Sequence, residues 1–302
     1  MLLKESFLWL DGVILRIDIV TGGRITMDKL NILFVTGLVT AEHQGRAIAQ
    51  RLRDLLEATG RFNVVITEEF RNITPEYLEP YDALFINYDG KLWPTEHARR
   101  FGEQSEAAVY DFVSKGKGIV FYHSTIWVDP DWPDEWRKLL GGYCAMDKGC
   151  RRVPKDDHFV EIMDENSPIT KDIDKKWMNV FDDLFTQVIV HPEAKMNVLA
   201  SIFDDVENYK VPGWPPKHHP VDIPDGKLEN MPGVNQYTPV IWTNEYGKGR
   251  VFVTSIGHWE ALDRFNFITM LVRGTEWAAS GEVTLEKPDR SGDNRLKLFP
   301  YY

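Results

Sequence analysis

The sequence predicts a three-layer α/β fold built on an open, mostly parallel sheet. Buried apolar runs alternate with segments of helical periodicity from Asn31 onward. Strands that are separated by helices pair in parallel through right-handed crossovers. The chain has 302 residues, which is enough for a large domain with its own core. Sheets of this kind bind ligands beyond the carboxyl ends of their strands, so the residues that follow each strand are the candidates for a site.

Each element of the first half has its own signal. Residues 31–37 (NILFVTG) form a continuous apolar run, which is typical of a strand buried on both faces. Leucines at helical spacing follow over 43–59, where Gly60 fits a helix C-cap, and Pro75 starts a short helix. The other expected elements are strands at 63–69, 83–89 and 118–125 and a helix at about 95–114.

The second half is less regular. Two further strands are expected at 158–163 and 197–204, and a closing helix at 261–279. The runs 239–246 and 250–258 flank a Gly-Lys-Gly turn, a pattern that predicts a β-hairpin. Between the expected strand at 197–204 and this hairpin, residues 205–238 hold six prolines. We expect a long structureless loop there, acting as a lid, a binding loop or a partner surface.

The two ends of the chain are expected to lie outside the core. The first 26 residues are apolar, but Asp11, Arg16 and Asp18 interrupt them. This stretch is too broken for a secretory signal and too short to cross a bilayer. We therefore expect an N-terminal extension at 1–26, a single domain at 27–285 and a polar tail at 286–302, with little contribution to the core from Glu282 onward.

Charge and cysteine content limit the partners. The formal net charge of −11 and the absence of a clustered basic face argue against nucleic acid. Cys144 and Cys150 could form a disulfide, bind a metal or do neither; without a secretion signal, free thiols in a reducing, cytoplasmic compartment are the favoured interpretation. We expect no nucleotide cofactor and no membrane partner, and a homo-oligomer remains open.

Histidines and an acidic pair follow the expected strands. His123 ends the fourth strand and His258 ends the second strand of the hairpin, where imidazoles could bind a metal or carry protons. His43 follows the first strand, and Asp182-Asp183 lies between apolar residues. Each has a structural alternative: a hydrogen-bonded histidine, a solvated helix start, or an Asp pair in a turn or helix cap.

Other residues near the strand ends are candidates for binding substrate. Trp127, Trp259, Tyr122 and Asp89 fall in or beside the expected crevice loops. Tryptophans stack on the C–H faces of sugars, although most of them are expected to serve packing. Ser124 lacks the flanking glycines of a nucleophile elbow, so a serine hydrolase is an unfavoured third hypothesis.

Several blocks, in order, resemble the ThuA-like family, which is linked to trehalose and keto-sugar utilisation. They are Gly116–Ser124, Leu139–Tyr143, Asp182–Phe185, Tyr246–Phe252 followed by Gly257-His258, and Arg273–Ala279. The resemblance implies a flavodoxin-like sheet related to class I glutamine amidotransferases, without their catalytic cysteine. The chain departs from the family where a histidine usually follows the Gly-Gly-aromatic block, and His158 could compensate.

The resemblance and the strand-end residues together predict a keto-sugar isomerase or lyase that removes a proton next to a carbonyl. His123, His258 and Asp183 are the expected catalytic residues. A divalent metal, zinc or manganese, could assist, with His123, His258 and His43 as its ligands. The alternative is a non-catalytic carbohydrate- or partner-binding module that uses the same crevice.

Overall fold

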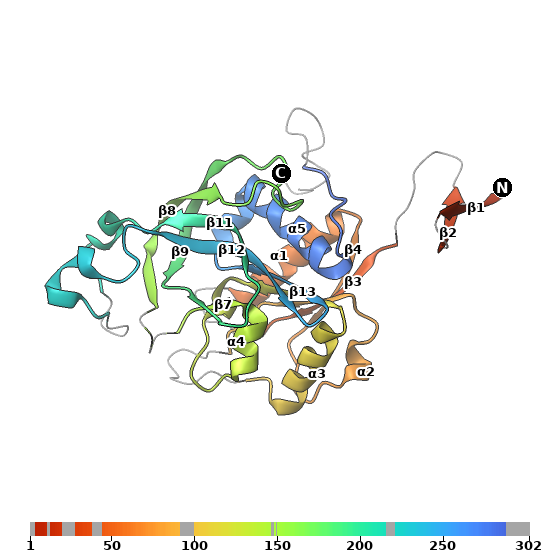
Figure 1. Cartoon of the computed structure of the whole chain (residues 1–302), viewed down its shortest axis with the longest axis horizontal. Helices are drawn as coiled ribbons and strands as arrows, with labels where there is room; N and C mark the ends of the chain where they lie inside the picture. The colour runs from red at the N-terminus through yellow and green to blue at the C-terminus, as the bar shows by residue number, and fades with distance from the viewer. Residues whose placement is uncertain are drawn as a thin grey trace.

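The computed structural model describes residues 4–10, 13–19, 28–37, 44–90, 100–145, 148, 150–215 and 221–287. At its start, β1 (Lys4–Leu10) and β2 (Val13–Ile19) pair with each other in an antiparallel hairpin (Figure 1). This hairpin is a two-stranded sheet of its own and joins no strand of the large sheet. The boundary expected at residue 27 stays a prediction.

A nine-stranded sheet forms the centre of the molecule, in the order β4-β3-β5-β6-β13-β12-β11-β8-β9. The first five strands of this order run parallel. Their first four are the buried strands expected from the apolar runs. The five are β3 (Leu30–Val35), β4 (Phe62–Thr67), β5 (Ala83–Ile86), β6 (Gly118–Tyr122) and β13 (Gly249–Thr254).

The other half of the sheet is antiparallel, so the expectation of a mostly parallel sheet was wrong for this half. The predicted hairpin reverses the chain between β12 and β13, and each later neighbour pairs antiparallel. The strands are β8 (Arg151–Ile162), β9 (Lys176–Thr186), β11 (Asn197–Phe203) and β12 (Tyr237–Tyr246). A separate short sheet pairs β7 (Gly142–Tyr143) with β10 (Ile189–Val190).

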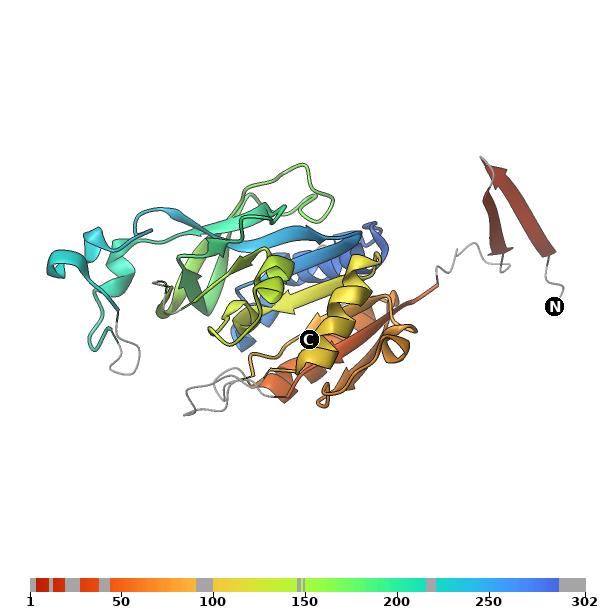
Figure 2. The same ribbon diagram turned by 60° about the horizontal axis from the view of Figure 1, so that its bottom comes forward.

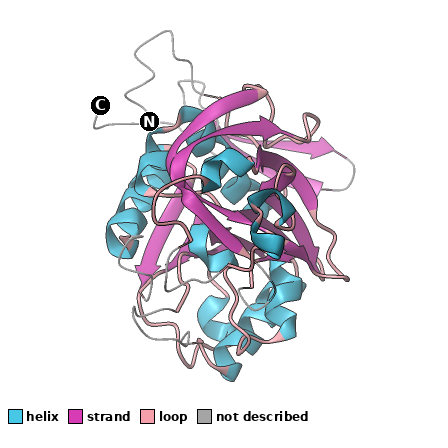
Figure 3. Cartoon of the chain, turned by 90° about the vertical axis from the view of Figure 1, so that its left-hand side faces the viewer, coloured by secondary structure: helices cyan, strands magenta, loops and turns pink. Residues whose placement is uncertain are grey.

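Helices lie on both sides of the parallel half (Figures 1 and 3). Alternate residues of β3 explain this arrangement: Ile32 and Phe34 belong to one apolar core, and Leu33 and Val35 belong to the other. α1 (Gly45–Ala58) and α5 (Phe265–Ser280) cover the first core. On the second side lie α2 (Pro75–Leu78), α3 (Glu103–Ser114) and α4 (Asp134–Leu140). The more specific prediction, a flavodoxin-like arrangement of the layers, stays a prediction.

None of the described helices combines the length and the apolar character that a membrane span requires. The closing helix begins later than expected, because the short helix η7 (Trp259–Asp263) precedes α5. Likewise, α3 begins at Glu103, and residues 95–99 of the helix expected at about 95–114 lie outside the described residues.

The proline-rich segment is not structureless, which corrects the prediction for residues 205–238. It contains the short helices η4 (Val206–Tyr209), η5 (Pro224–Gly226) and η6 (Leu228–Asn230), and it projects from the β11–β12 end of the sheet (Figure 2). Residues 216–220 lie outside the described residues.

A buried ion pair anchors the base of this segment. The guanidinium of Arg151 lies 3.0 Å from a carboxylate oxygen of Asp204, whose other oxygen accepts from the Tyr209 hydroxyl at 2.7 Å. Arg151 also donates to the Pro232 carbonyl at 2.6 Å. All three charged or hydroxyl side chains are buried. The segment is therefore fastened to β8 at its base, because breaking a buried pair of this kind is costly.

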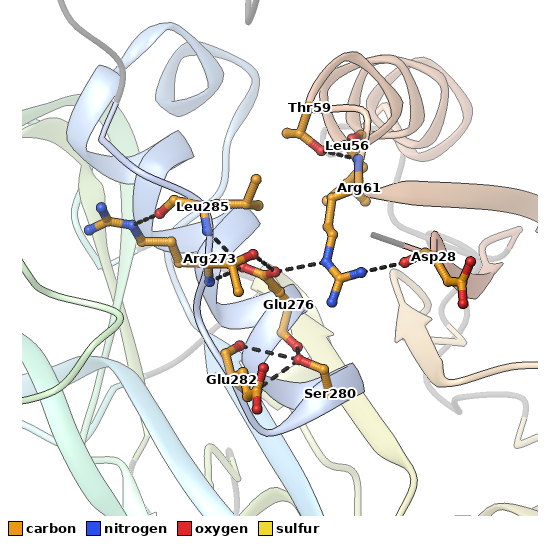
Figure 4. Close-up of polar contacts among 10 residues, drawn as sticks. Asp28, Leu56, Thr59, Arg61, Arg273, Glu276, Ser280, Glu282 and Leu285 are labelled. Atoms are coloured by element: carbon orange, nitrogen blue, oxygen red, sulfur yellow. Dashed lines mark hydrogen bonds and ion pairs between the residues drawn. The ribbon is translucent and has the colours of Figure 1, made fainter. Parts of the chain in front are cut away.

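The residues after α5 are held by a buried carboxylate (Figure 4). Glu276 is fully buried and accepts from Arg61 Nε at 2.8 Å, from the Thr284 N–H at 2.8 Å and from the Leu285 N–H at 3.0 Å. Arg273 Nε donates to the Leu285 carbonyl at 2.7 Å. The expectation that the chain adds little from Glu282 onward was therefore wrong for 282–285, because α5 supplies hydrogen-bond partners for their backbone.

The two cysteines form a disulfide, Cys144–Cys150, which corrects the expectation of free thiols. The chain between them folds back on itself, since the N–H groups of Lys148 and Cys150 both donate to the Ala145 carbonyl. This turn brings the two Cα atoms to 5.4 Å, a separation that a disulfide can bridge.

Candidate functional site

Two histidines and an aspartate from distant parts of the chain meet in one buried cluster. His123 follows β6, His258 follows β13, and Asp183 lies in β9. One ligand atom from each lies within 4.8 Å of the other two, and the two imidazole centroids are 5.2 Å apart. The prediction that His123 and His258 meet at one edge of the sheet is therefore confirmed, whereas the catalytic roles expected for them stay predictions.

His123 occupies a sharp turn rather than the end of an extended strand. β6 stops at Tyr122, and His123 begins the short helix η2 (His123–Ile126) with a φ of 54°. A residue with a Cβ rarely adopts this left-handed conformation, and such strain is typical of functional positions. The turn directs the imidazole into the cluster, and it replaces the extended arrangement that the sequence predicted for 118–125.

A carbonyl sets the tautomer of His123. Its Nδ1 lies 2.8 Å from the Ser255 carbonyl oxygen, which can only accept a hydrogen bond. Nδ1 therefore carries the proton in the neutral ring, and Nε2 keeps its lone pair. An imidazole held in this way is oriented to bind a metal or to take a proton through Nε2.

Asp183 connects His258 to a cation. One carboxylate oxygen lies 3.3 Å from His258 Nε2, and the other lies 2.9 Å from Arg152 Nε. Asp183 is fully buried, whereas the Arg152 side chain remains 32% exposed. The other ring nitrogen of His258 lies 3.7 Å from the Glu260 carboxylate. The cluster therefore combines two imidazoles with a carboxylate whose charge is balanced by an arginine.

Adjacent aspartates both point inward because β9 is irregular. Side chains alternate in a regular strand, but Phe181 has a φ of 49°, and the pairing of β8 with β9 shifts register nearby. Asp182 and Asp183 are consequently both 0% exposed. The prediction left open a turn or a helix cap for this pair; the structure places it in a bulged strand.

Asp182 positions the segment that carries His258. Its carboxylate accepts from the N–H of Gly257 at 2.8 Å, from the N–H of His258 at 3.2 Å and from Asn179 Nδ2 at 2.8 Å. Burial outweighs these donors and raises the pKa of Asp182 to about 6. Asp182 is thus a positioning residue that ties the end of β13 to β9.

Tyr122 lies behind the cluster. Its side chain is 0% exposed, and its hydroxyl donates to the Gly257 carbonyl at 2.6 Å. A Cβ at position 257 would come within 2.6 Å of the Tyr122 ring, so only glycine allows this approach. The burial argues against the direct substrate contact that was predicted for Tyr122, and burial raises the pKa of its hydroxyl.

The other predicted binding residues have different surroundings. Trp127 packs edge-on against Phe185, which in turn lies 5.5 Å from the His123 ring. The guanidinium of Arg51 lies 4.7 Å from the centroid of Trp259. Asp89 is buried after β5, and His43 lies outside the described residues. Their roles in binding stay predictions.

Sequence reasoning missed Arg152 and left His158 as a compensating ligand. The only signal for Arg152 in the sequence was the Arg151-Arg152 pair. Because successive residues of a strand point to opposite faces, Arg151 pairs with Asp204 and Arg152 pairs with Asp183. His158 is buried, and burial lowers its pKa. Among the described residues, the group that could hold a metal consists of His123, Asp183 and His258, without His158.

The fold and the cluster define an α/β protein with a buried His-Asp-His site at the ends of parallel strands. A comparison with family models identifies its class: the ThuA family, described as trehalose utilisation, matches residues 31–278. The chain belongs to the ThuA family. No curated protein matches the chain.

Solved structures of similar fold include ThuA-like proteins. One from Parabacteroides merdae has 21% identity and a TM-score of 0.65 and covers 87% of this chain and 94% of its own. One from Bacteroides uniformis has 18% identity, a TM-score of 0.57 and coverages of 89% and 95%. A cytoplasmic protein from Salmonella typhimurium has 14% identity, a TM-score of 0.52 and coverages of 83% and 100%. At these identities the likeness concerns the fold alone.

Proposed function

We propose that this protein is a carbohydrate-utilisation enzyme that removes a proton next to the carbonyl of a keto-sugar or keto-glycoside. The trehalose-utilisation description of its family supports a role with carbohydrates. The observation that carries the enzymatic part is the convergence of His123, Asp183 and His258, whose ligand atoms lie within 4.8 Å of one another. Buried titratable groups that converge at strand ends are typical of catalytic sites.

The reaction begins at the carbon beside the carbonyl. A carbonyl at C3 acidifies the C2–H bond, and His123 Nε2 takes this proton while the C–H electron pair forms an enolate. His258, held by Asp183, and the partly exposed Arg152 supply positive charge or hydrogen bonds for the enolate oxygen. Delivery of a proton from His258 to the opposite face of C2 isomerises the sugar, and the proton held by His123 then returns to His258 through water. Loss of the glycosidic oxygen from C1, protonated by the imidazolium, completes a β-elimination.

A divalent metal fits the same residues. Zinc and manganese accept imidazole nitrogens and carboxylate oxygens, and the three ligand atoms of the cluster lie within 4.8 Å of one another. His123 is already oriented through its Ser255 contact, and Asp183 through Arg152. When bound, the metal would polarise the carbonyl and stabilise the enolate. His43, the third predicted ligand, lies outside the described residues.

Hydrogen–deuterium exchange tests the proton abstraction directly. A 3-keto-glucoside incubated with the protein in D₂O should lose its C2 proton signal in the NMR spectrum, and His123→Gln should slow this exchange by about 100-fold or more. His191→Gln, a buried histidine outside the cluster, is the matched control and should retain the rate. Wild-type protein that binds the sugar without exchange would instead favour the non-catalytic binding module.

Elemental analysis before and after chelation decides the role of the metal. Stoichiometric zinc or manganese that disappears in His258→Ala, together with loss of exchange on chelation, supports metal assistance. Full exchange by metal-free protein assigns the imidazoles to proton transfer alone.

Two further predictions belong to this proposal. One is a cytoplasmic location. The other is the role of residues 205–238 as a lid, and the structure shows this segment anchored at its base.

A further inference from the structure

A groove of about 460 Å³ lies between the start of β9 and the N-terminus of α5. None of the cluster residues lines it; its walls come from the start of β9 and the residues just before it, and from the chain that runs from the end of η7 into the first turn of α5. A volume of this size is within the range of pockets that bind small molecules. The groove contains both aromatic surface and charged groups, including Trp177 and Arg264.

Arg264 carries a charge that no described residue balances. It caps α5 and lines the groove, yet its side chain makes no ion pair or hydrogen bond within the described part of the chain, and its Nε is buried. Burying part of a guanidinium without a partner costs free energy. A carboxylate or a phosphate would offset this cost, because the planar guanidinium can bind either group through two parallel hydrogen bonds.

The other charges of the groove are already balanced. Lys176 pairs with Glu161 at 2.7 Å, Asp174 lies 3.4 Å from Lys287, and Asp263 pairs with Arg51. The acids therefore do not neutralise Arg264. The groove keeps one excess positive charge, and Arg264 bears it.

Two buried polar side chains line the same groove with an unpartnered atom. Trp177 is 6% exposed, and its indole Nε1–H has no acceptor among the described residues. Asn266 is 5% exposed; its Nδ2 donates to Asp174 at 2.9 Å, but its Oδ1 receives no hydrogen bond from the described chain. Buried polar atoms are rarely left unsatisfied, so a missing partner for them points to a ligand.

The N-terminus of α5 adds a third attraction for an anion. This helix has 16 residues, no acidic residue in its first turn and no side-chain cap. The first N–H groups of a helix have no partner within it, and they carry the positive end of the helix dipole. An anion in the groove would lie at this end, as phosphates do at other helix N-termini.

We propose that this groove is a second ligand site, which binds a small metabolite carrying an anionic group and a hydroxyl, such as a sugar phosphate or a hydroxy acid. Arg264 and the Trp177 indole N–H contact the anionic group, and Asn266 Oδ1 accepts from the hydroxyl. The site stands apart from the His123–Asp183–His258 cluster and does not depend on the reaction proposed there.

Calorimetric titration of the full chain at constant ionic strength tests the site. The probes are glucose 6-phosphate, citrate, inorganic phosphate and glucose. Saturable binding of glucose 6-phosphate or of citrate is expected, and comparison of these two identifies the preferred anion; glucose alone should not bind in this groove. Arg264→Ala should weaken binding by about tenfold or more, because it removes charge-assisted hydrogen bonds.

Three further variants control the result. Trp177→Phe keeps the aromatic packing and should weaken binding severalfold, which gives an independent measurement if Arg264→Ala folds poorly. Arg71→Ala, an exposed arginine outside the groove, and His123→Ala in the cluster should both bind as the wild type does. The proposal is overturned if no anionic probe saturates, or if Arg264→Ala and Trp177→Phe both retain wild-type affinity.

Discussion

The carboxylate of Asp182 accepts the backbone N–H of His258 at 3.2 Å. Through this contact, the outermost antiparallel strand fixes the loop that leaves the last parallel strand. The geometry of the cluster therefore depends on both halves of the sheet. A substitution at Asp182 should displace His258 through its backbone, although the imidazole itself makes no part of this contact.

Removing this carboxylate should destabilise the fold. Asp182→Ala leaves the N–H groups of Gly257 and His258 without an acceptor in a buried site, at an expected cost of about 2–4 kcal/mol. Urea unfolding measures the loss. Asp222→Ala, at an exposed aspartate, should change stability by less than about 0.5 kcal/mol. Equal stabilities for the two variants would contradict the positioning role.

The free energy of unfolding should depend on pH through the titration of Asp182. Its pKa is raised to about 6 from 3.8, so the folded protein binds this proton more tightly than the unfolded chain does. The contribution is present below about pH 4 and is lost as pH rises to about 6, with an upper limit of about 3 kcal/mol. The stability advantage of wild type over Asp182→Asn should thus fall between pH 4 and pH 7, measured by unfolding at several pH values. An advantage that grows with pH would reverse the sign and refute this assignment.

Arg152 should affect the reaction more than the fold. Its Nε lies 2.9 Å from Asp183, but its side chain is 32% exposed, so solvent screens much of the ion pair. Arg152→Ala is expected to slow deuterium exchange about 10- to 100-fold while the unfolding free energy changes by about 1 kcal/mol. Arg46→Ala, which breaks an exposed ion pair with Glu68, is the control for a general charge effect. A variant with unchanged exchange would remove Arg152 from the mechanism.

Glu276 should be among the most sensitive positions outside the site. Glu276→Ala leaves Arg61 without its partner and frees the backbone of Thr284 and Leu285, with an expected loss of about 3–5 kcal/mol. Thermal and urea unfolding both measure it. Glu282→Ala, an exposed glutamate, should be nearly neutral. If truncation after residue 281 leaves stability unchanged, the hydrogen bonds from Thr284 and Leu285 to Glu276 do not stabilise the fold.

Thiol titration checks the disulfide. Denatured protein that has not been reduced should show no free thiol, and two should appear after reduction, because Cys144 and Cys150 are bonded to each other. Two free thiols before reduction, in protein purified without reductant, would restore the original expectation from the sequence.

Local patterns in the sequence determined the parallel half of this protein. The apolar runs that became β3 to β6 and the Gly-Lys-Gly turn between β12 and β13 each act within about ten residues, and they placed His123 and His258 at strand ends. Because parallel strands end at a common edge, their meeting could be predicted without a structure.

Only the tertiary structure decided the rest of the site. β9 carries Asp182 and Asp183, but its strand was not expected, because a positive φ at Phe181 breaks the alternation that a strand pattern requires. The pairing of Arg152 with Asp183 joins residues 31 positions apart across an irregular ladder, and the Cys144–Cys150 bond depends on how one loop folds back. Such contacts arise from packing between distant segments, and local residue patterns do not encode which distant segments will meet.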